Sequence, residues 1–310
     1  CQPMATSSIC EAAVPKSRAT QSRMKGRSRR RSEKLGAEET GAEAGAGDGA
    51  GPDIASRIAE PPWAAQGRGL STLRAPMPDT DALAVVHEDA HLLVLDKPAG
   101  LLCVPGRGDD KQDCLSARAM RRWPDALVVH RLDMATSGLV LMARSPMMQR
   151  ALGDAFAGRQ VHKRYEAIVD GAMPMRDDDE WGVIDAPLMA DWPRRPLQKV
   201  DPAGKPSLTR WRALGTAAMP SAAGSMATHV LLEPLTGRSH QLRVHLLSLG
   251  HPILGDALYG SDAVRARAPR LLLHASELGF VHPATQQPVR FCSAPEFALA
   301  DLSVPATARP

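Results

Sequence analysis

The sequence predicts a mixed α+β domain built on one large mixed, mainly antiparallel sheet flanked by helices. Three observations lead to this prediction. Most apolar runs are short and of strand length. Clear helical periodicity is found in few segments. The predicted strands and helices do not alternate regularly, which argues against a doubly wound parallel sheet.

The first 77 residues differ in composition from the rest of the chain. Residues 41–51 consist only of Gly, Ala and two acidic residues. Such a stretch cannot bury enough apolar area to offset the entropy of ordering its backbone. We therefore expect residues 1–77 to be a disordered, basic, Ala- and Gly-rich tail, and residues 78–305 to form one domain. The sequence begins with Cys1, so Met24 and Met77 are alternative starts of translation, which would leave part or all of the tail untranslated.

One acidic residue stands out in the domain. Asp133 lies between two apolar runs, 126–129 and 139–143, and Thr136-Ser137-Gly138 has the composition of a turn. We expect both runs to be buried strands. A carboxylate at such a strand end needs a cationic or hydrogen-bonding partner, whether its role is structural or chemical. Taken alone, the pattern fits a turn-capping aspartate better than a catalytic one.

A second region predicts a strand followed by a helix. Residues 228–235 read as a strand, and after Thr236-Gly237-Arg238 a helix is expected with Ser239 as its N-cap and Gly250 at its end. Leu242, Leu246 and Leu249 recur at helical spacing and predict the buried stripe. Arg243 lies beside this stripe, so its side chain can point inward.

Three motifs together resemble one family. They are HRLDMATSG (130–138), KRYEAIVDG (163–171), and TGRSHQLRVH (236–245) with its continuation GHPILGD (250–256). The first is the hallmark of the RluA-type pseudouridine synthases, which isomerise selected uridines in structured RNA. The resemblance covers roughly residues 80–295, including the opening DKPAGLL (96–102). We find no sign of the N-terminal S4 RNA-binding domain that many relatives carry.

The resemblance implies a fold, a reaction and a set of site residues. It implies a cleft along one face of the large sheet, where a uridine extruded from its RNA is converted to pseudouridine. Asp133 would be the nucleophile, attacking C1′ or C6, Arg243 its ion-pair partner, and Tyr165 an aromatic face and possible base for the C5 proton. Arg131 would fill the vacated stack. The further residues that we expect at the RNA are His130, Thr136, Lys163, Arg164, Arg238 and His240.

The resemblance also implies the partners. The expected substrates are a 23S rRNA hairpin loop and the tRNA anticodon stem-loop. The isomerisation needs no redox agent or metal, so we expect no cofactor. We expect a monomer without an obligatory protein partner. The sequence has no apolar run of membrane-spanning length and no secretory signal pattern, so cytoplasmic residence is the default expectation.

The charge distribution limits how RNA can be bound. Residues 1–80 hold 12 of the chain's 38 Lys and Arg and 9 of its 34 Asp and Glu. Residues 81–310 therefore hold 26 basic and 25 acidic residues. A nearly neutral domain must bind RNA through a local groove. The candidate clusters are Arg159 with Lys163 and Arg164, and Arg194 with Arg195 and Lys199. A solvated surface is an equally good reading of each cluster.

Other chemistries find less support in the residues. The five cysteines lack metal-ligand spacing. His240 and His245 are rotated too far apart on a helix to bind one metal ion together. We expect structural roles for both side chains. A glycosidase would need a second carboxylate beside Asp133, for which Glu233 stays open. No Gly-x-Ser-x-Gly motif supports a serine hydrolase. The main alternative to the enzyme is a noncatalytic RNA-binding or RNA-chaperone module.

Overall fold

The computed structural model describes residues 83–175, 177, 180–219 and 225–302. The predicted tail and both predicted ends of the domain lie outside the described residues. In chain order the elements are β1 Ala84–Glu88, β2 Leu92–Lys97, η2 Asp109–Lys111, α1 Leu115–Arg122, β3 Leu127–Val128, β4 Ser137–Ala143, α2 Pro146–Ala157, β5 His162–Asp170, β6 Gly182–Asp185, β7 Leu188–Ala190, η3 Trp192–Arg194, β8 Gln198–Val200, β9 Leu208–Ala218, β10 Met226–Pro234, α3 Gln241–Ser248, α4 Asp262–Arg265, β11 Leu273–Val281, β12 Pro288–Cys292 and α5 Leu299–Leu302.

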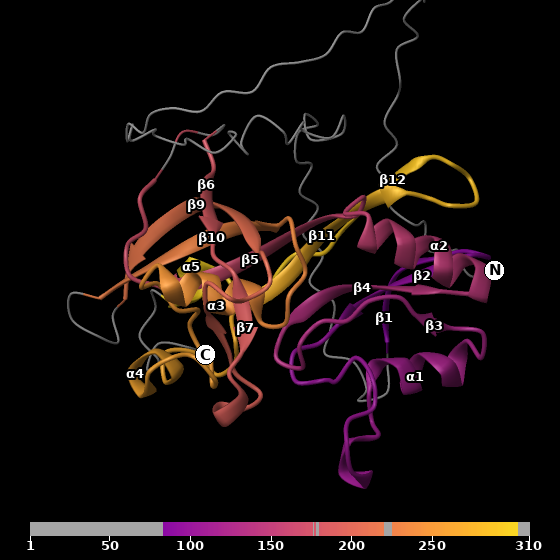
Figure 1. Cartoon of the computed structure of the whole chain (residues 1–310), viewed down its shortest axis with the longest axis horizontal. Helices are drawn as coiled ribbons and strands as arrows, with labels where there is room; N and C mark the ends of the chain where they lie inside the picture. Colours follow the sequence, from indigo (N-terminus) through magenta and orange to yellow (C-terminus); the bar gives the residue numbers. More distant parts are fainter. Residues whose placement is uncertain (1–82, 176, 178–179, 220–224, 303–310) are drawn as a thin grey trace, which may run out of the picture. The chain divides into compact units, whose positions relative to one another are not determined.

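One large sheet runs through the described part of the chain (Figure 1). Its strand order is β1-β2-β4-β11-β5-β10-β9-β6, with β12 beside β11 and β3 beside β4. The pairing of β4 with β11 is parallel, and the other pairings within the sheet are antiparallel. β7 and β8 form a separate hairpin. The predicted mixed, mainly antiparallel sheet with helices on its faces is therefore confirmed.

β2 and β4 are buried on both faces because a helix covers each side (Figure 1). Successive strand residues point to opposite faces, so the two strands feed two cores. Each fully buried Leu contributes about 1.5–3 kcal/mol relative to exposure. The core against α2 contains Leu92, Val94, Leu139, Leu141, Met148 and Leu152, and the core against α1 contains Leu93, Leu95, Val140, Met142, Leu115 and Ala119.

The segment around Asp133 differs from the prediction in two details. The strand expected over 126–129 is limited to Leu127–Val128. The turn runs from Asp133 to Thr136, whose N–H donates to the Asp133 carbonyl at 3.1 Å, whereas Ser137 and Gly138 already belong to β4. Gly138 has φ 109°, and a Cβ there would overlap the backbone of Ala275 on β11. The glycine therefore serves the close parallel contact of β4 with β11 rather than the turn.

Helix α3 packs against β10 of the large sheet and against β8 of the hairpin. Leu242 and Leu246 are buried there, as predicted, but Leu249 is 40% exposed because it is already the C-cap residue. The helix ends before Gly250, as expected, and this glycine has φ 80°. The N-cap prediction was wrong: His240, with φ 54° and ψ 18°, is the N-cap in place of Ser239. Its left-handed backbone costs on the order of 1 kcal/mol.

Among the described residues, no helix has the length and apolar character needed to cross a membrane.

Candidate active site

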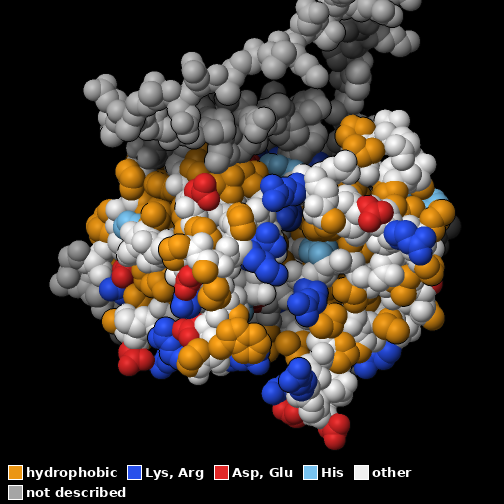
Figure 2. All heavy atoms as spheres, in the orientation of Figure 1, with side chains coloured by type: hydrophobic (Ala, Val, Ile, Leu, Met, Phe, Trp, Pro, Cys, Tyr) orange, Lys and Arg blue, Asp and Glu red, His pale blue; other side chains and the backbone are white. Residues whose placement is uncertain are grey.

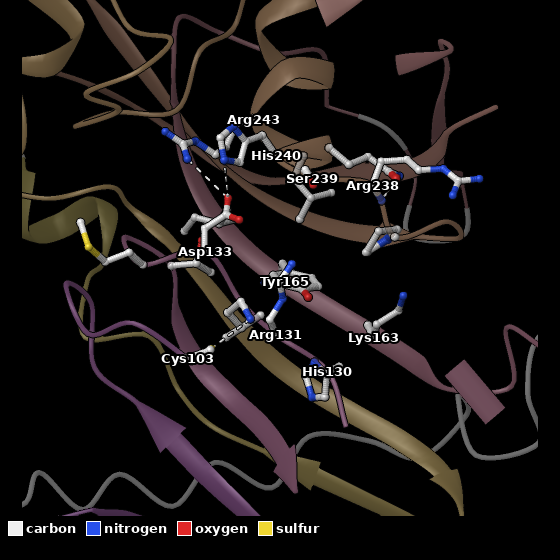
Figure 3. A pocket seen from close by; sticks show the side chains of 18 of the residues that line it. Cys103, His130, Arg131, Asp133, Lys163, Tyr165, Arg238, Ser239, His240 and Arg243 are labelled. Carbon is white, nitrogen blue, oxygen red and sulfur yellow. Dashed lines mark hydrogen bonds and ion pairs between the residues drawn. The ribbon is translucent and has the colours of Figure 1, made fainter. Parts of the chain in front are cut away.

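The three sequence motifs meet around one cavity of about 540 Å³. It is lined by residues 130–134 of the first motif, by Lys163 and Tyr165 of the second, and by residues 236–243 of the third. Figure 3 shows these side chains converging from the β3–β4 loop, from β5 and from the start of α3. The sheet thus brings together residues that are 110 positions apart in the chain.

Asp133 faces two nitrogen-bearing side chains in this cavity (Figure 3). Arg243 Nη1 lies 3.4 Å from Asp133 Oδ2, and His240 Nε2 lies 3.9 Å from the same oxygen. The Asp133 side chain is 31% exposed, so its carboxylate is paired and still open to the cavity. Among the described lining residues it is the only acid. A paired, accessible carboxylate can act as a nucleophile.

Arg243 is 3% exposed and is held by a residue that the sequence prediction of the site missed. Asp256 accepts from Arg243 Nε at 2.8 Å and from Nη2 at 2.5 Å. Burial alone would lower the pKa of Arg243, but the hydrogen bond and charge of Asp256 outweigh it and raise the pKa. The guanidinium therefore stays charged. The sequence did contain an indication of this residue, because Asp256 is the last residue of GHPILGD, the continuation of the third motif.

The loop that carries Asp133 is fixed from beneath by two further residues without a predicted site role. Buried Lys97 donates through Nζ to the carbonyls of Pro98 and Leu101 and, at 3.0 Å, to that of Met134. Burial lowers its pKa to about 8. The buried Cys103 thiol accepts the N–H of Leu132 at 3.2 Å. These contacts hold the residues on both sides of Asp133 in place.

Tyr165 lines the cavity from β5 and is half-buried. Burial raises the pKa of its hydroxyl, and the nearby Asp133 and Cys103 act in the same direction. The phenol is therefore protonated near neutral pH. It offers a ring face and a hydrogen-bond donor, whereas the expected role as a base would require losing a proton that this environment retains.

Arg131 and Lys163 bring positive charge to the cavity (Figure 3). Arg131 is exposed. Burial lowers the pKa of Lys163, and no carboxylate pairs with it within the part of the chain that the structure describes. Arg238 is exposed at the rim, with only long contacts of 3.4 Å from its guanidinium to the Pro206 carbonyl. All three cations are open to a ligand.

Comparison with known proteins supports the motif resemblance. A family model described as RNA pseudouridylate synthase matches residues 91–248. The dual-specificity RNA pseudouridine synthase RluA of Escherichia coli is 44% identical over 221 residues, which are 71% of this chain and 96% of that relative. The protein of the same name from Vibrio parahaemolyticus is 47% identical over 208 residues, covering 66% and 81%. The chain belongs to the RNA pseudouridylate synthase family.

A solved structure gives the same result for the fold of this RNA pseudouridylate synthase family member. The human RNA pseudouridylate synthase domain containing 1 superposes with a TM-score of 0.59 at 28% identity, covering 73% of this chain and 89% of that chain. The family resemblance stated from the three motifs is thereby confirmed.

Two residues that the family resemblance places at the RNA also support the loop. His130 Nε2 accepts the N–H of Leu141 at 2.9 Å, and its ring stacks on Phe156 with centroids 4.6 Å apart. Burial, with a smaller effect of Lys163, lowers the pKa of His130 to about 3. Thr136 is 3% exposed and closes the turn that begins at Asp133. Both residues also line the cavity, so a contact of either with RNA stays a prediction.

Arg164 was expected beside Lys163 at the RNA, but it lies on the other face of β5. Side chains alternate along a strand, so Lys163 and Tyr165 share the cavity face while Arg164 points away. Its Nε donates to Glu233 at 2.7 Å. Glu233 is 4% exposed and also faces Arg210, so it is not a second carboxylate beside Asp133. Lys163 and Arg164 of the predicted basic cluster therefore do not share a face of the strand.

The second predicted cluster lies outside the cavity, near the β7–β8 hairpin. Arg194 pairs with Asp191 at 2.6 Å, and Lys199 pairs with Asp201 at 2.8 Å. The guanidinium of Arg195 lies 3.2 Å from the ring centroid of the exposed Trp192. Local acids thus offset much of this cluster's charge.

The structural role predicted for His245 agrees with the structure. His245 is buried and hydrogen-bonds through Nδ1 to Thr209 Oγ1 at 2.9 Å and through Nε2 to the Ala186 carbonyl at 3.0 Å, which is a structural role. Within the described part of the chain, no group of three or more His, Cys, Asp or Glu residues is arranged to hold a metal ion.

Proposed function

We propose that this protein is an RNA pseudouridine synthase that isomerises specific uridines in structured RNA loops. The observation that carries the proposal is the pairing of the cavity's single described carboxylate, Asp133, with the charged guanidinium of Arg243. Membership of the family and the relatives' dual specificity extend the proposal to two substrates, a 23S rRNA hairpin loop and a tRNA anticodon stem-loop.

The size of the cavity suits one extruded nucleotide. Pockets for small ligands typically have volumes of about 300–1,000 Å³, and this one has about 540 Å³. A uridine stacked in RNA hides its reactive atoms, so it must leave the stack to reach Asp133. Arg131 is exposed and adjacent to Asp133 in sequence, and its planar guanidinium can occupy the space that the base vacates.

The isomerisation breaks the glycosidic bond between C1′ and N1 and forms a bond between C1′ and C5. Asp133 attacks C1′ or C6, the uracil detaches and rotates, C5 joins C1′, and the bond to Asp133 breaks, which releases the carboxylate. C5 loses a proton and N1 gains one, so the reaction is balanced without an oxidant or reductant. The Tyr165 ring stacks on the uracil, and its protonated hydroxyl donates a hydrogen bond to it.

The RNA backbone is held by cations around the cavity. Lys163, Arg131 and Arg238 are the described cations best placed for phosphate contacts. Figure 2 shows Lys and Arg side chains gathered along the middle of the face that it draws. Because the domain is nearly neutral overall, such local contacts supply the affinity and its salt dependence.

The remaining parts of the proposal concern the state of the protein. We place it in the cytoplasm as a monomer that acts without a cofactor or an obligatory protein partner. The alternative of a noncatalytic RNA-binding module is not favoured, because Asp133, Tyr165 and Arg243 are all present at one cavity.

The test uses an unmodified tRNA anticodon stem-loop and a large-subunit rRNA hairpin. Pseudouridine is mapped by carbodiimide labelling and primer extension, with Asp113→Asn as a control at a carboxylate that is 60% exposed and does not line the cavity. The protein and the control should form pseudouridine, whereas Asp133→Asn should bind RNA and form none. Equal product from Asp133→Asn would remove Asp133 from the mechanism. No product from the unchanged protein or from either variant would favour the noncatalytic RNA-binding module.

A further inference from the structure

Tyr259 contacts the residues on both sides of the Asp133 carboxylate. Its hydroxyl lies 2.7 Å from His240 Nδ1, and the two rings meet edge to face at 83°. Its ring also lies beneath the Arg243 guanidinium, 5.0 Å from centroid to Cζ. His240 Nε2 and Arg243 Nη1 are the two nitrogens that face Asp133 Oδ2. Tyr259 therefore supports both partners of the carboxylate.

Tyr259 is itself held by the acid that binds Arg243. The backbone N–H groups of Leu258 and Tyr259 donate to Asp256 Oδ1 at 2.9 and 3.1 Å. Asp256 is 1% exposed and accepts from two nitrogens of Arg243. One turn thus fixes the position of the Tyr259 side chain and that of the Arg243 guanidinium.

The hydrogen-bond directions around the Tyr259 hydroxyl follow from its other partner. The backbone N–H of Gln198, at the start of β8, donates to Tyr259 Oη at 2.8 Å, and an amide can only donate. The single hydroxyl proton can then be donated to His240 Nδ1, the second partner of this hydroxyl among the described residues. A neutral imidazole that accepts at Nδ1 carries its proton on Nε2.

The electrostatics of both groups agree with this assignment. Burial lowers the pKa of His240, with Asp133 opposing the effect and Arg243 adding to it, so the ring is neutral at neutral pH. Burial raises the pKa of Tyr259, so its hydroxyl keeps the proton that it donates. The proton then lies on His240 Nε2, the ring nitrogen nearer Asp133, at 3.9 Å from Oδ2, which is longer than a hydrogen bond.

We infer that Tyr259 is a positioning residue that holds His240 as the neutral Nε2–H tautomer facing Asp133, and that it thereby orients the carboxylate together with Arg243. The inference rests on the proposed function, in which Asp133 is the nucleophile. The neutral donor complements the charged one: Arg243 supplies the countercharge, and His240 fixes the direction of the second contact.

The first test reads the tautomer in the free, full-length protein. Histidine labelled with isotopic nitrogen is observed by long-range proton–nitrogen NMR, and His240 is assigned by comparison with His240→Gln. We expect the Nε2–H tautomer in the unchanged protein and a shift toward the Nδ1–H tautomer in Tyr259→Phe, which lacks the donor. An Nδ1–H tautomer in the unchanged protein, or an unaltered His240 signal in Tyr259→Phe, overturns the inference.

The second test separates positioning from binding by turnover on the stem-loop. Tyr259→Phe should lower kcat about tenfold and leave KM within about twofold. Tyr259→Leu should lower kcat further, because the ring contact with Arg243 is also lost. Full kcat in Tyr259→Phe, or a rise in KM without a fall in kcat, contradicts a positioning role.

Two controls keep these results interpretable. Asp201→Asn disturbs the end of the β7–β8 hairpin by removing the ion pair with Lys199 and should leave kcat and the His240 signal unchanged. An equal loss of kcat in this control would assign the effect to the hairpin and overturn the inference. The chain has only two tyrosines, so fluorotyrosine labelling leaves Tyr165 as the single signal in Tyr259→Phe and reports whether the cavity keeps its fold. If the protein forms no pseudouridine, the proposed function is wrong. The tautomer measurement is independent of turnover and still tests the contact of Tyr259 with His240.

Discussion

Asp256 binds Arg243 through two contacts, Nε to Oδ2 at 2.8 Å and Nη2 to Oδ1 at 2.5 Å, and leaves Nη1 to face Asp133. The shortest of the described ion pairs of Arg243 therefore does not include the proposed nucleophile. Asp256 aligns the guanidinium, and Asp133 receives its third nitrogen at the longer distance of 3.4 Å. Because Asp133 is not held in a bidentate pair, its carboxylate is oriented by Arg243 and is still free to react.

Asp256→Asn should impair both stability and turnover. The substitution leaves the Arg243 charge buried without its main partner, which typically costs about 3–5 kcal/mol. Urea unfolding measures the free energy, and the stem-loop assay measures the turnover. The control is Asp262→Asn, because that carboxylate is 96% exposed and its contact with Arg265 is 3.3 Å. We expect the control to change stability by less than about 0.5 kcal/mol. Equal stability of the two variants would contradict this account of the buried pair.

Lys163→Ala should weaken RNA binding for all sequences alike. The loss of one phosphate contact should reduce the slope of log affinity against log salt by about 0.7–0.9. Arg164→Gln is the matched control, because the neighbouring side chain lies on the opposite face of β5 and pairs with Glu233. It should lower stability and keep the salt slope. A salt slope that falls in Arg164→Gln and not in Lys163→Ala would reverse our assignment of the RNA-facing side.

Arg131→Ala should weaken extrusion of the base more than binding of the duplex, because the vacated stack loses its replacement. The fluorescence of 2-aminopurine beside the target uridine measures unstacking, and a gel-shift titration measures binding. Arg265→Ala removes an arginine that is 55% exposed and does not line the cavity, and it should change neither measurement. An unchanged 2-aminopurine signal in Arg131→Ala would show that another group fills the stack.

Tyr165→Phe should retain RNA binding and lose turnover, since only the hydroxyl is removed and the ring that stacks on uracil stays. A rapid-mixing assay at saturating RNA measures the chemical step. Because the pKa of Tyr165 is raised, we expect no acceleration from tyrosinate formation between pH 6 and 9. A full rate in Tyr165→Phe would show that the hydroxyl is dispensable.

Stability should fall as the pH is lowered below the ordinary histidine pKa of 6.5. His130 and His162 both have their pKa lowered to about 3 by burial in the folded chain. Between these values the unfolded chain binds more protons than the folded one, so acid favours unfolding. Each histidine can add a slope of at most about 1.4 kcal/mol per pH unit. His130→Gln should flatten the dependence of the unfolding free energy on pH, and an unchanged slope would contradict the assigned burial.

The local motifs made much of the site predictable. Asp133, Tyr165 and Arg243 were chosen from the sequence, and all three line the cavity. The helix end at Gly250 and the buried strand 139–143 also followed from local patterns, because backbone permissiveness and strand-length apolar runs are properties of short segments. The sequence by itself therefore determined the family, the main elements and the residues on which the proposed chemistry depends.

The tertiary structure decided which of these residues face one another. Register and pleat put Lys163 and Arg164 on opposite faces of β5, so two residues that are adjacent in the sequence have different surroundings. The pairing of Asp256 with Arg243, and the contact of Tyr259 with His240, join residues whose spacing gives no helical or strand periodicity. Such contacts depend on how whole elements pack, and packing is a property of the folded chain that no single segment encodes.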